Sequence, residues 1–269
     1  MDNPENALFP APAADVPDPE RTAPGVIETV GTILFYFLLQ ALVSTALAWL
    51  LAWHYAPAGS LPGMAEIRST MARPNVTVAV IIGTLFGAAL GTLATIRWRW
   101  RPWLDVSLPP GLGLTGTNPV LILVGLAVGL MTPLAGGALT KLLAGDHDVS
   151  QTVTEIAEGS SVGMRVLLVV AVVTIGPFVE EVLFRGALFS ALRRWVSPAW
   201  TIAIVAAAFA LVHLPDLHWQ WYALPNLALI GAMCAWLRVI SGSLWPAVAA
   251  HAANNLLATI AWFMASHAN

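Results

Sequence analysis

With 58% hydrophobic and only 10% charged residues among 269, the chain does not have the composition of a water-soluble globular protein. Its formal net charge is −3 and it contains no basic run, which argues against a nucleic-acid partner. A single cysteine, Cys234, excludes an intrachain disulfide and a zinc site built from several cysteines. The composition therefore predicts an integral membrane protein.

The chain begins with a Pro/Ala-rich acidic stretch, residues 1–24, which we expect to be a disordered tail. Seven apolar runs follow, each near the roughly 20 residues that cross a bilayer. We place them at about 26–53, 75–96, 119–142, 164–192, 198–214, 221–240 and 244–265. The pattern predicts an all-α polytopic transmembrane bundle with about seven spans, in a range of six to eight.

Two of these runs are unusual. The fourth is long enough to project from the membrane, or to break near Gly176-Pro177, because proline removes a helix hydrogen bond. The fifth is short for a full span. Lys and Arg near span ends favour a cytoplasmic N-terminus, and we expect a multi-pass protein of a bacterial cytoplasmic membrane.

Three charged residues interrupt the fourth run. Glu181 and Arg185 are four residues apart and share one helix face, where they can form an ion pair. Glu180 lies about 100° around the helix from Glu181 and is free of that pair. Because charges inside a bilayer are costly, this predicts one structural carboxylate and one that is available for chemistry.

Two histidines also fall inside apolar runs. His213 lies about 24 Å along its helix from the turn near Val196-Ser197, and Glu180 lies equally far along the preceding helix. His251 lies about 15 Å into the last run, and shares a helix face with Asn255. The spacing predicts that Glu180 and His213 meet at one depth, and leaves the depth of His251 unresolved.

These side chains suit hydrolysis. A carboxylate beside an imidazole can deprotonate a water, and a second imidazole with an amide can hold a developing oxyanion. Glu180, His213 and His251 could instead bind a divalent metal such as zinc, although the chain has no His-Glu-x2-His motif. The residues thus leave open whether the reaction needs no cofactor or a metal.

Three ordered motifs resemble those of the CAAX prenyl protease and bacteriocin-processing (CPBP, or Abi) family of intramembrane proteases. They are Glu180-Glu181-x3-Arg185, Phe209-x3-His213 and His251-x3-Asn255. The resemblance covers about residues 164–260. We therefore divide the chain into the tail, N-terminal membrane helices and loops over 25–163, and a catalytic core over 164–265.

The resemblance implies roles for seven residues. Glu180 and His213 would activate water, and His251 and Asn255 would bind the oxyanion. Glu181, Arg185 and Phe209 would brace the site. The family has been described both as metalloproteases and as glutamate proteases, so the name does not decide the metal.

We accordingly expect an endopeptidase that acts on a protein or on a lipidated, for example prenylated, peptide substrate at a cavity open to the cytoplasm. Its partners would be membrane lipid and this substrate. The competing interpretation is a non-enzymatic membrane protein, either a bacteriocin self-immunity protein or scaffold, or a transporter with a buried Glu/His relay. The lack of internal repeats argues against the transporter.

Overall fold

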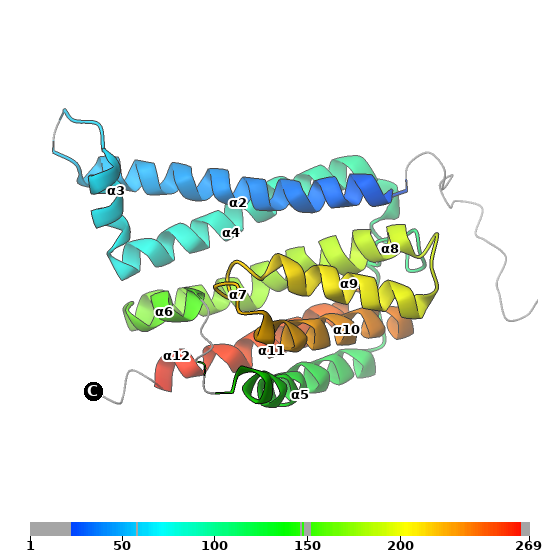
Figure 1. Cartoon of the computed structure of the whole chain (residues 1–269). Helices are drawn as coiled ribbons and strands as arrows, with labels where there is room; N and C mark the ends of the chain where they lie inside the picture. The colour runs from blue at the N-terminus through cyan, green and yellow to red at the C-terminus, as the bar shows by residue number, and fades with distance from the viewer. Residues whose placement is uncertain (1–22, 58, 146, 148–151, 265–269) are drawn as a thin grey trace, which may run out of the picture.

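The computed structural model describes residues 23–264 except 58, 146 and 148–151, and in this part every regular element is helical (Figure 1). The predicted all-α class is confirmed. Most of the predicted tail lies outside the described residues. The division into domains stays a prediction.

The seven predicted apolar runs all correspond to helices. The long helices are α2 (Val26–Tyr55), α4 (Pro74–Trp100), α5 (Pro119–Ala144), α7 (Val162–Glu181), α9 (Pro198–Val212), α10 (Leu224–Ser241) and α11 (Trp245–Thr259). The short helices are α3 (Met64–Met71), η2 (Arg101–Trp103), α6 (Thr152–Glu158), η3 (Val182–Leu188), α8 (Phe189–Leu192), η4 (Trp221–Ala223) and α12 (Ala261–Met264).

Five helical stretches in the described part are long and apolar enough to cross a membrane. They are Val26–Tyr55, Pro74–Trp103, Pro119–Ala144, Val162–Leu192 and Trp221–Ser241. Helices α9 and α11 have 15 residues each. At 1.5 Å per residue each is roughly 22 Å long, shorter than the hydrocarbon core of a bilayer. The chain is therefore an integral membrane protein by length and composition, and α9 and α11 are shorter than its five candidate spans.

The fourth run contains a change of helix type rather than a break. Helix α7 continues through Pro177 to Glu181, and the chain then forms the π-helix η3 over Val182–Leu188. Of the two alternatives for this run, the break near Gly176-Pro177 is wrong, because the helix accommodates the missing N–H of Pro177 without ending. A π-helical turn often marks a functional site, and this one holds Arg185.

Glycines allow α4 to lie close beside α2, at one edge of the bundle (Figure 1). The glycines of α4 recur every four residues, and a Cβ on them would come within 2.8–3.1 Å of side chains on α2. The pairs are Gly83 with Leu47, Gly87 with Val43 and Gly91 with Leu39. Small residues at this spacing are typical of close helix packing in membranes.

Helix α5 approaches α11 even more closely. A Cβ on Gly125 would lie 2.3 Å from the Pro246 carbonyl oxygen, and a Cβ on Gly129 would lie 2.0 Å from that of Ala250. Backbone therefore packs directly on backbone, which only glycine permits here. This contact fixes the position of α11 immediately before His251.

The connector between α4 and α5 packs against the ends of the C-terminal helices. The guanidinium of Arg238 donates to the carbonyl oxygens of Ser107 (2.7 Å) and Gly111 (2.9 Å). The Leu244 amide donates to the Gly113 carbonyl oxygen at 2.8 Å. This connector, residues 104–118, thus covers the end of the bundle where α10 ends and α11 begins.

Candidate active site

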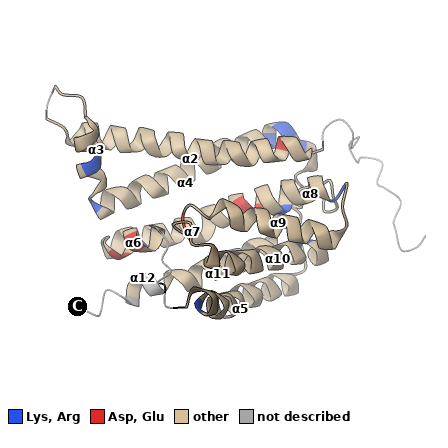
Figure 2. Ribbon diagram, in the orientation of Figure 1, with Lys and Arg blue, Asp and Glu red and all other residues tan. Residues whose placement is uncertain are grey.

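The predicted pair of Glu181 and Arg185 forms a fully buried ion pair. The Nη1 atom of Arg185 lies 2.8 Å from the Oε1 atom of Glu181, and both side chains are 0% exposed. The Nη2 atom of Arg185 donates to the Gly231 carbonyl oxygen at 3.0 Å, which ties this pair to α10. The i,i+4 spacing therefore produces the predicted pair, inside the bundle rather than on its surface. Figure 2 shows an acidic segment of the ribbon in the middle of the bundle, near α9.

The neighbouring carboxylate, Glu180, faces two imidazole rings. Its Oε2 atom lies 3.8 Å from the Nε2 atom of His213 and 3.7 Å from that of His251. Both distances are too long for a direct hydrogen bond, and a water beside the three atoms could bridge them. The side chain of Glu180 is 18% exposed, whereas that of Glu181 is 0% exposed. The two adjacent acids thus occupy different environments, as the 100° rotation predicts.

Hydrogen bonds orient both rings with Nε2 toward Glu180. The Nδ1 atom of His213 lies 2.7 Å from the Phe209 carbonyl oxygen, which can only accept. The Nδ1 atom of His251 lies 2.9 Å from the Oε1 atom of Glu181, which already accepts from Arg185. Each neutral ring therefore carries its hydrogen on Nδ1 and presents the Nε2 lone pair to Glu180.

The depth of His251 is explained by a recessed start of α11. A Cβ on Gly186 would lie 3.5 Å from the Leu244 Cδ1 atom, so Leu244 is level with Gly186 rather than with the turn after α8. Glu180 precedes Gly186 by six residues, and His251 follows Leu244 by seven. The two side chains consequently lie at the same depth, although counting residues from the start of the last apolar run did not predict this.

Phe209 packs at the centre of the site. Its ring centroid lies 4.7 Å from that of His213 and 5.4 Å from that of His251, and the Arg185 guanidinium carbon lies 4.4 Å above its ring. A cation over an aromatic face is attracted by the ring quadrupole. Phe209 therefore contacts both histidines and the buried ion pair at once.

Asn255 lines the same cavity, and its amide group is already bonded. Its Nδ2 atom donates to the Val172 carbonyl oxygen at 2.9 Å, and its Oδ1 atom lies 3.2 Å from the Nδ2 atom of Asn254. The first bond joins α11 to α7. One of the two Nδ2 hydrogens remains for a ligand in the cavity.

A cavity of about 500 Å³ joins the site to one end of the bundle. From Glu180 it extends past α2 and α4 to residues of α3, α6 and α12, namely Met71, Val153, Ile156 and Trp262. None of the residues that line it comes from the connector or from the turn after α8. The cavity thus extends away from the end where α2 begins, so a cytoplasmic N-terminus and a cavity open to the cytoplasm are not compatible expectations.

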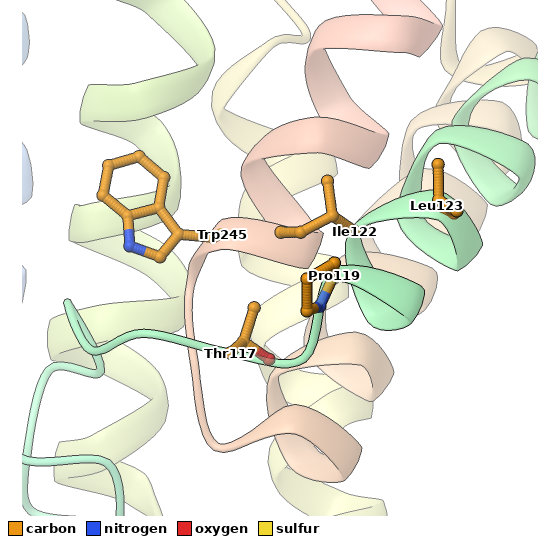
Figure 3. A pocket seen from close by; sticks show the side chains of 5 residues that line it. All are labelled: Thr117, Pro119, Ile122, Leu123 and Trp245. Carbon is orange, nitrogen blue, oxygen red and sulfur yellow. The ribbon is translucent and has the colours of Figure 1, made fainter.

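A second hollow lies beside the start of α5 (Figure 3). It is lined by Thr117, Pro119, Ile122, Leu123 and Trp245. Apart from the Thr117 hydroxyl and the Trp245 indole N–H these side chains are apolar, and none of them is an acid or a base. The cavity at Glu180 is therefore the candidate active site.

The donors at Glu180 fit zinc in kind, because two imidazoles and a carboxylate are a common catalytic zinc set. Their spacing does not fit. Ligand atoms around tetrahedral zinc stand about 3.3 Å apart, less than the 3.7 and 3.8 Å found here. Among the described residues no group of three or more His, Cys, Asp or Glu is arranged to hold a metal ion. We therefore derive no step through a metal.

The three motifs do not include the cavity wall that α2 and α4 provide. Tyr36, Gln40 and Ser44 of α2 and Thr84 of α4 line the same cavity as Glu180. Polar residues at every fourth position of an otherwise apolar helix are the signal that could have identified this wall.

Comparison with known proteins supports the predicted resemblance. Residues 162–257 match the model of the family described as type II CAAX prenyl endopeptidase Rce1-like. This part of the chain is similar to that family, and we call it the Rce1-like segment. The match runs from the start of α7 into α11 and contains all three motifs, so the resemblance to the CPBP family is confirmed.

The Rce1-like segment is about a third of the chain and includes all seven site residues that the motifs predict. Helices α2, α4 and α5 lie outside it. A search of curated proteins and a search of solved structures gave no match.

Proposed function

We propose that the protein is an intramembrane endopeptidase in which Glu180 and His213 activate a water for attack on a peptide bond. The observation that carries this proposal is the approach of Glu180 Oε2 to two Nε2 atoms at 3.7 and 3.8 Å inside a cavity. The match to an endopeptidase family supports the general activity.

The reaction can be written with the side chains alone. A water donates one hydrogen to Glu180 Oε2 and the other to an imidazole Nε2. As Glu180 takes the proton, the water oxygen forms a bond to the substrate carbonyl carbon. Glu180 then passes that proton to the amide nitrogen, the carbon–nitrogen bond breaks, and an acid and an amine are released.

The developing oxyanion needs hydrogen-bond donors. Asn255 can supply its second Nδ2 hydrogen. His251 can donate from Nε2 only when both of its nitrogens carry hydrogen, because Nδ1–H is bonded to Glu181. Glu181 holds the Nδ1 side of this ring at 2.9 Å, and this gives the bracing acid a second role in orienting His251.

A substrate that reaches this site comes from the membrane or from the end of the bundle near α3, α6 and α12. The cavity size suits a peptide segment rather than a folded domain. We propose protein or lipidated peptide substrates, in line with the family description.

The test is cleavage of a fluorogenic peptide library by the purified protein in detergent or liposomes. Glu180→Gln keeps the shape of the side chain and removes the base, so we expect loss of cleavage with unchanged folding. Glu28→Gln is the matched control, because Glu28 pairs with Arg99 near the start of α2, far from the cavity. Cleavage by Glu180→Gln at the wild-type rate eliminates the proposed mechanism, and no cleavage by the wild type leaves the scaffold or transporter interpretations.

A further inference from the structure

One face of α2 carries polar side chains into the cavity. Tyr36, Gln40 and Ser44 all line it and recur every four residues, so they lie in one row along the helix. We call this row the α2 stripe. On another face of the same helix Leu34, Leu38 and Leu42 are 63%, 54% and 57% exposed, as expected for contact with lipid.

The packing of α2 on α4 determines which way the stripe points. Leu39, Val43 and Leu47 pack on the glycines of α4. In the sequence Gln40 follows Leu39 and Ser44 follows Val43, so the stripe lies on the helix face next to this contact. Because the face with Leu39, Val43 and Leu47 contacts α4, the stripe faces the cavity that α7 and α11 also line. The stripe thus starts opposite Glu180 and leads along α2 toward α3.

Burial shows that the stripe is more than a solvated surface. Tyr36 is 1% exposed and within electrostatic reach of Glu180. On α4, Thr84 follows Gly83, which packs on Leu47, and so lies nearer the Ser44 end of the stripe than Tyr36. It is 8% exposed, and its hydroxyl has no hydrogen-bond partner in the described part of the chain. Buried polar groups are costly unless they are hydrogen-bonded, so this wall is suited to a polar ligand.

The spacing of the stripe matches an extended peptide. Four helical residues rise about 6 Å, and two residues of an extended chain span about 6.6 Å. Side chains at successive stripe positions can therefore reach the same kind of backbone group on alternate residues of a peptide. A stripe of three positions would span about five substrate residues.

We propose that Tyr36, Gln40 and Ser44 bind the backbone of an extended substrate segment and hold its scissile bond against Glu180. The proposal rests on the proposed function and adds a specificity rule to it. Because backbone groups are the same in every residue, the stripe selects an unfolded, extended segment rather than a side-chain sequence. It lies outside the Rce1-like segment, so α2 completes the site.

The experiment combines variants with altered peptides. Gln40→Leu, Ser44→Ala and Tyr36→Phe each remove hydrogen-bonding atoms and keep much of the side-chain volume. For a fluorescent peptide that the wild type cleaves, we expect KM to rise about fivefold for each lost bond with kcat changed less. N-methylation of the substrate amide that meets Gln40 should cause the same loss in the wild type and little further loss in Gln40→Leu.

Two substitutions on the same helix are the controls. Thr45→Ala alters the exposed residue beside Ser44, and Tyr55→Phe removes a phenol oxygen at the far end of α2. Both should keep the wild-type KM. Stripe variants whose KM equals that of the controls, or losses that simply add to those from N-methylation, overturn the proposal.

Binding separates this proposal from the catalytic one. The Glu180→Gln variant can be titrated with the same fluorescent peptides by anisotropy, with and without stripe substitutions. Weaker binding in the stripe variants supports the stripe even if the wild type cleaves nothing, in which case the catalytic proposal alone fails. Equal binding in all variants overturns the stripe whatever the cleavage result.

Discussion

The Nδ1 atom of His251 donates to the same Glu181 oxygen, at 2.9 Å, that accepts from Arg185 at 2.8 Å. One carboxylate oxygen thus joins a buried cation on the π-helix to a ring that faces Glu180. Glu181 consequently both compensates the charge of Arg185 and sets the hydrogen position on His251. Glu181 therefore has a structural role and Glu180 is the candidate base, and substitutions at the two positions should have different effects.

Glu181→Gln should lower the thermal stability of the protein, whereas Glu180→Gln should not. The change at Glu181 leaves the buried Arg185 without its counter-charge, and breaking a buried ion pair costs about 3–5 kcal/mol. The same change at Glu180, which is 18% exposed, should leave thermal unfolding in detergent nearly unchanged. Equal unfolding temperatures for the two variants would contradict this division of roles.

His213→Gln should lower kcat at least about a hundredfold, the lower end of general acid–base contributions. The side chain is 25% exposed, so we expect stability to change by less than about 1 kcal/mol. His218→Gln is the control, because His218 lies five residues further along and faces Glu155 instead of Glu180. Comparable kcat values for both variants would remove His213 from the mechanism.

Gly129→Ala should displace α11. The added methyl would lie 2.0 Å from the Ala250 carbonyl oxygen, and overpacking costs about 1–3 kcal/mol. Because His251 follows Ala250, activity should fall with stability. A Cβ on Gly137, in the same helix, meets nothing within 4 Å, so Gly137→Ala should unfold at the wild-type temperature. A stable, fully active Gly129→Ala would show that the α5–α11 contact is looser than described.

Asn255→Ala should affect two measurements at once. Loss of the bond to the Val172 carbonyl oxygen should cost about 0.5–1.5 kcal/mol of stability. Loss of the second amide hydrogen should lower kcat about a hundredfold if it binds the oxyanion. A stability loss with unchanged kcat would make Asn255 a structural amide that only joins α11 to α7.

Cleavage should persist after treatment with a strong zinc chelator. The distances of 3.7 and 3.8 Å around Glu180 are wider than those of a zinc site, whereas a water can bridge them. The measurement is the cleavage rate before and after chelation, followed by addition of zinc. Activity that disappears with chelator and returns with zinc would show that Glu180, His213 and His251 close around a metal.

Several features of the site are local and follow from the amino-acid sequence alone. The ion pair of Glu181 and Arg185 depends only on i,i+4 geometry, and the different direction of Glu180 depends only on the helical rotation of about 100° per residue. Glu180 and His213 lie at the same depth because a tight turn joins their two antiparallel helices. The number of residues from that turn then gives the depth of each side chain. Hydropathy in the same way predicts the helices, since each must satisfy its own backbone in lipid.

Tertiary structure decided what depends on contacts between distant segments. The recessed start of α11, bonded to the connector at Gly113, brings His251 to the depth of Glu180. The glycines of α4 turn the polar face of α2 into the cavity. The change to a π-helix after Glu181 likewise has no local sequence signal that we identified. These features arise from packing between surfaces far apart in the chain, and periodicity within one helix carries no information about which neighbour that helix meets.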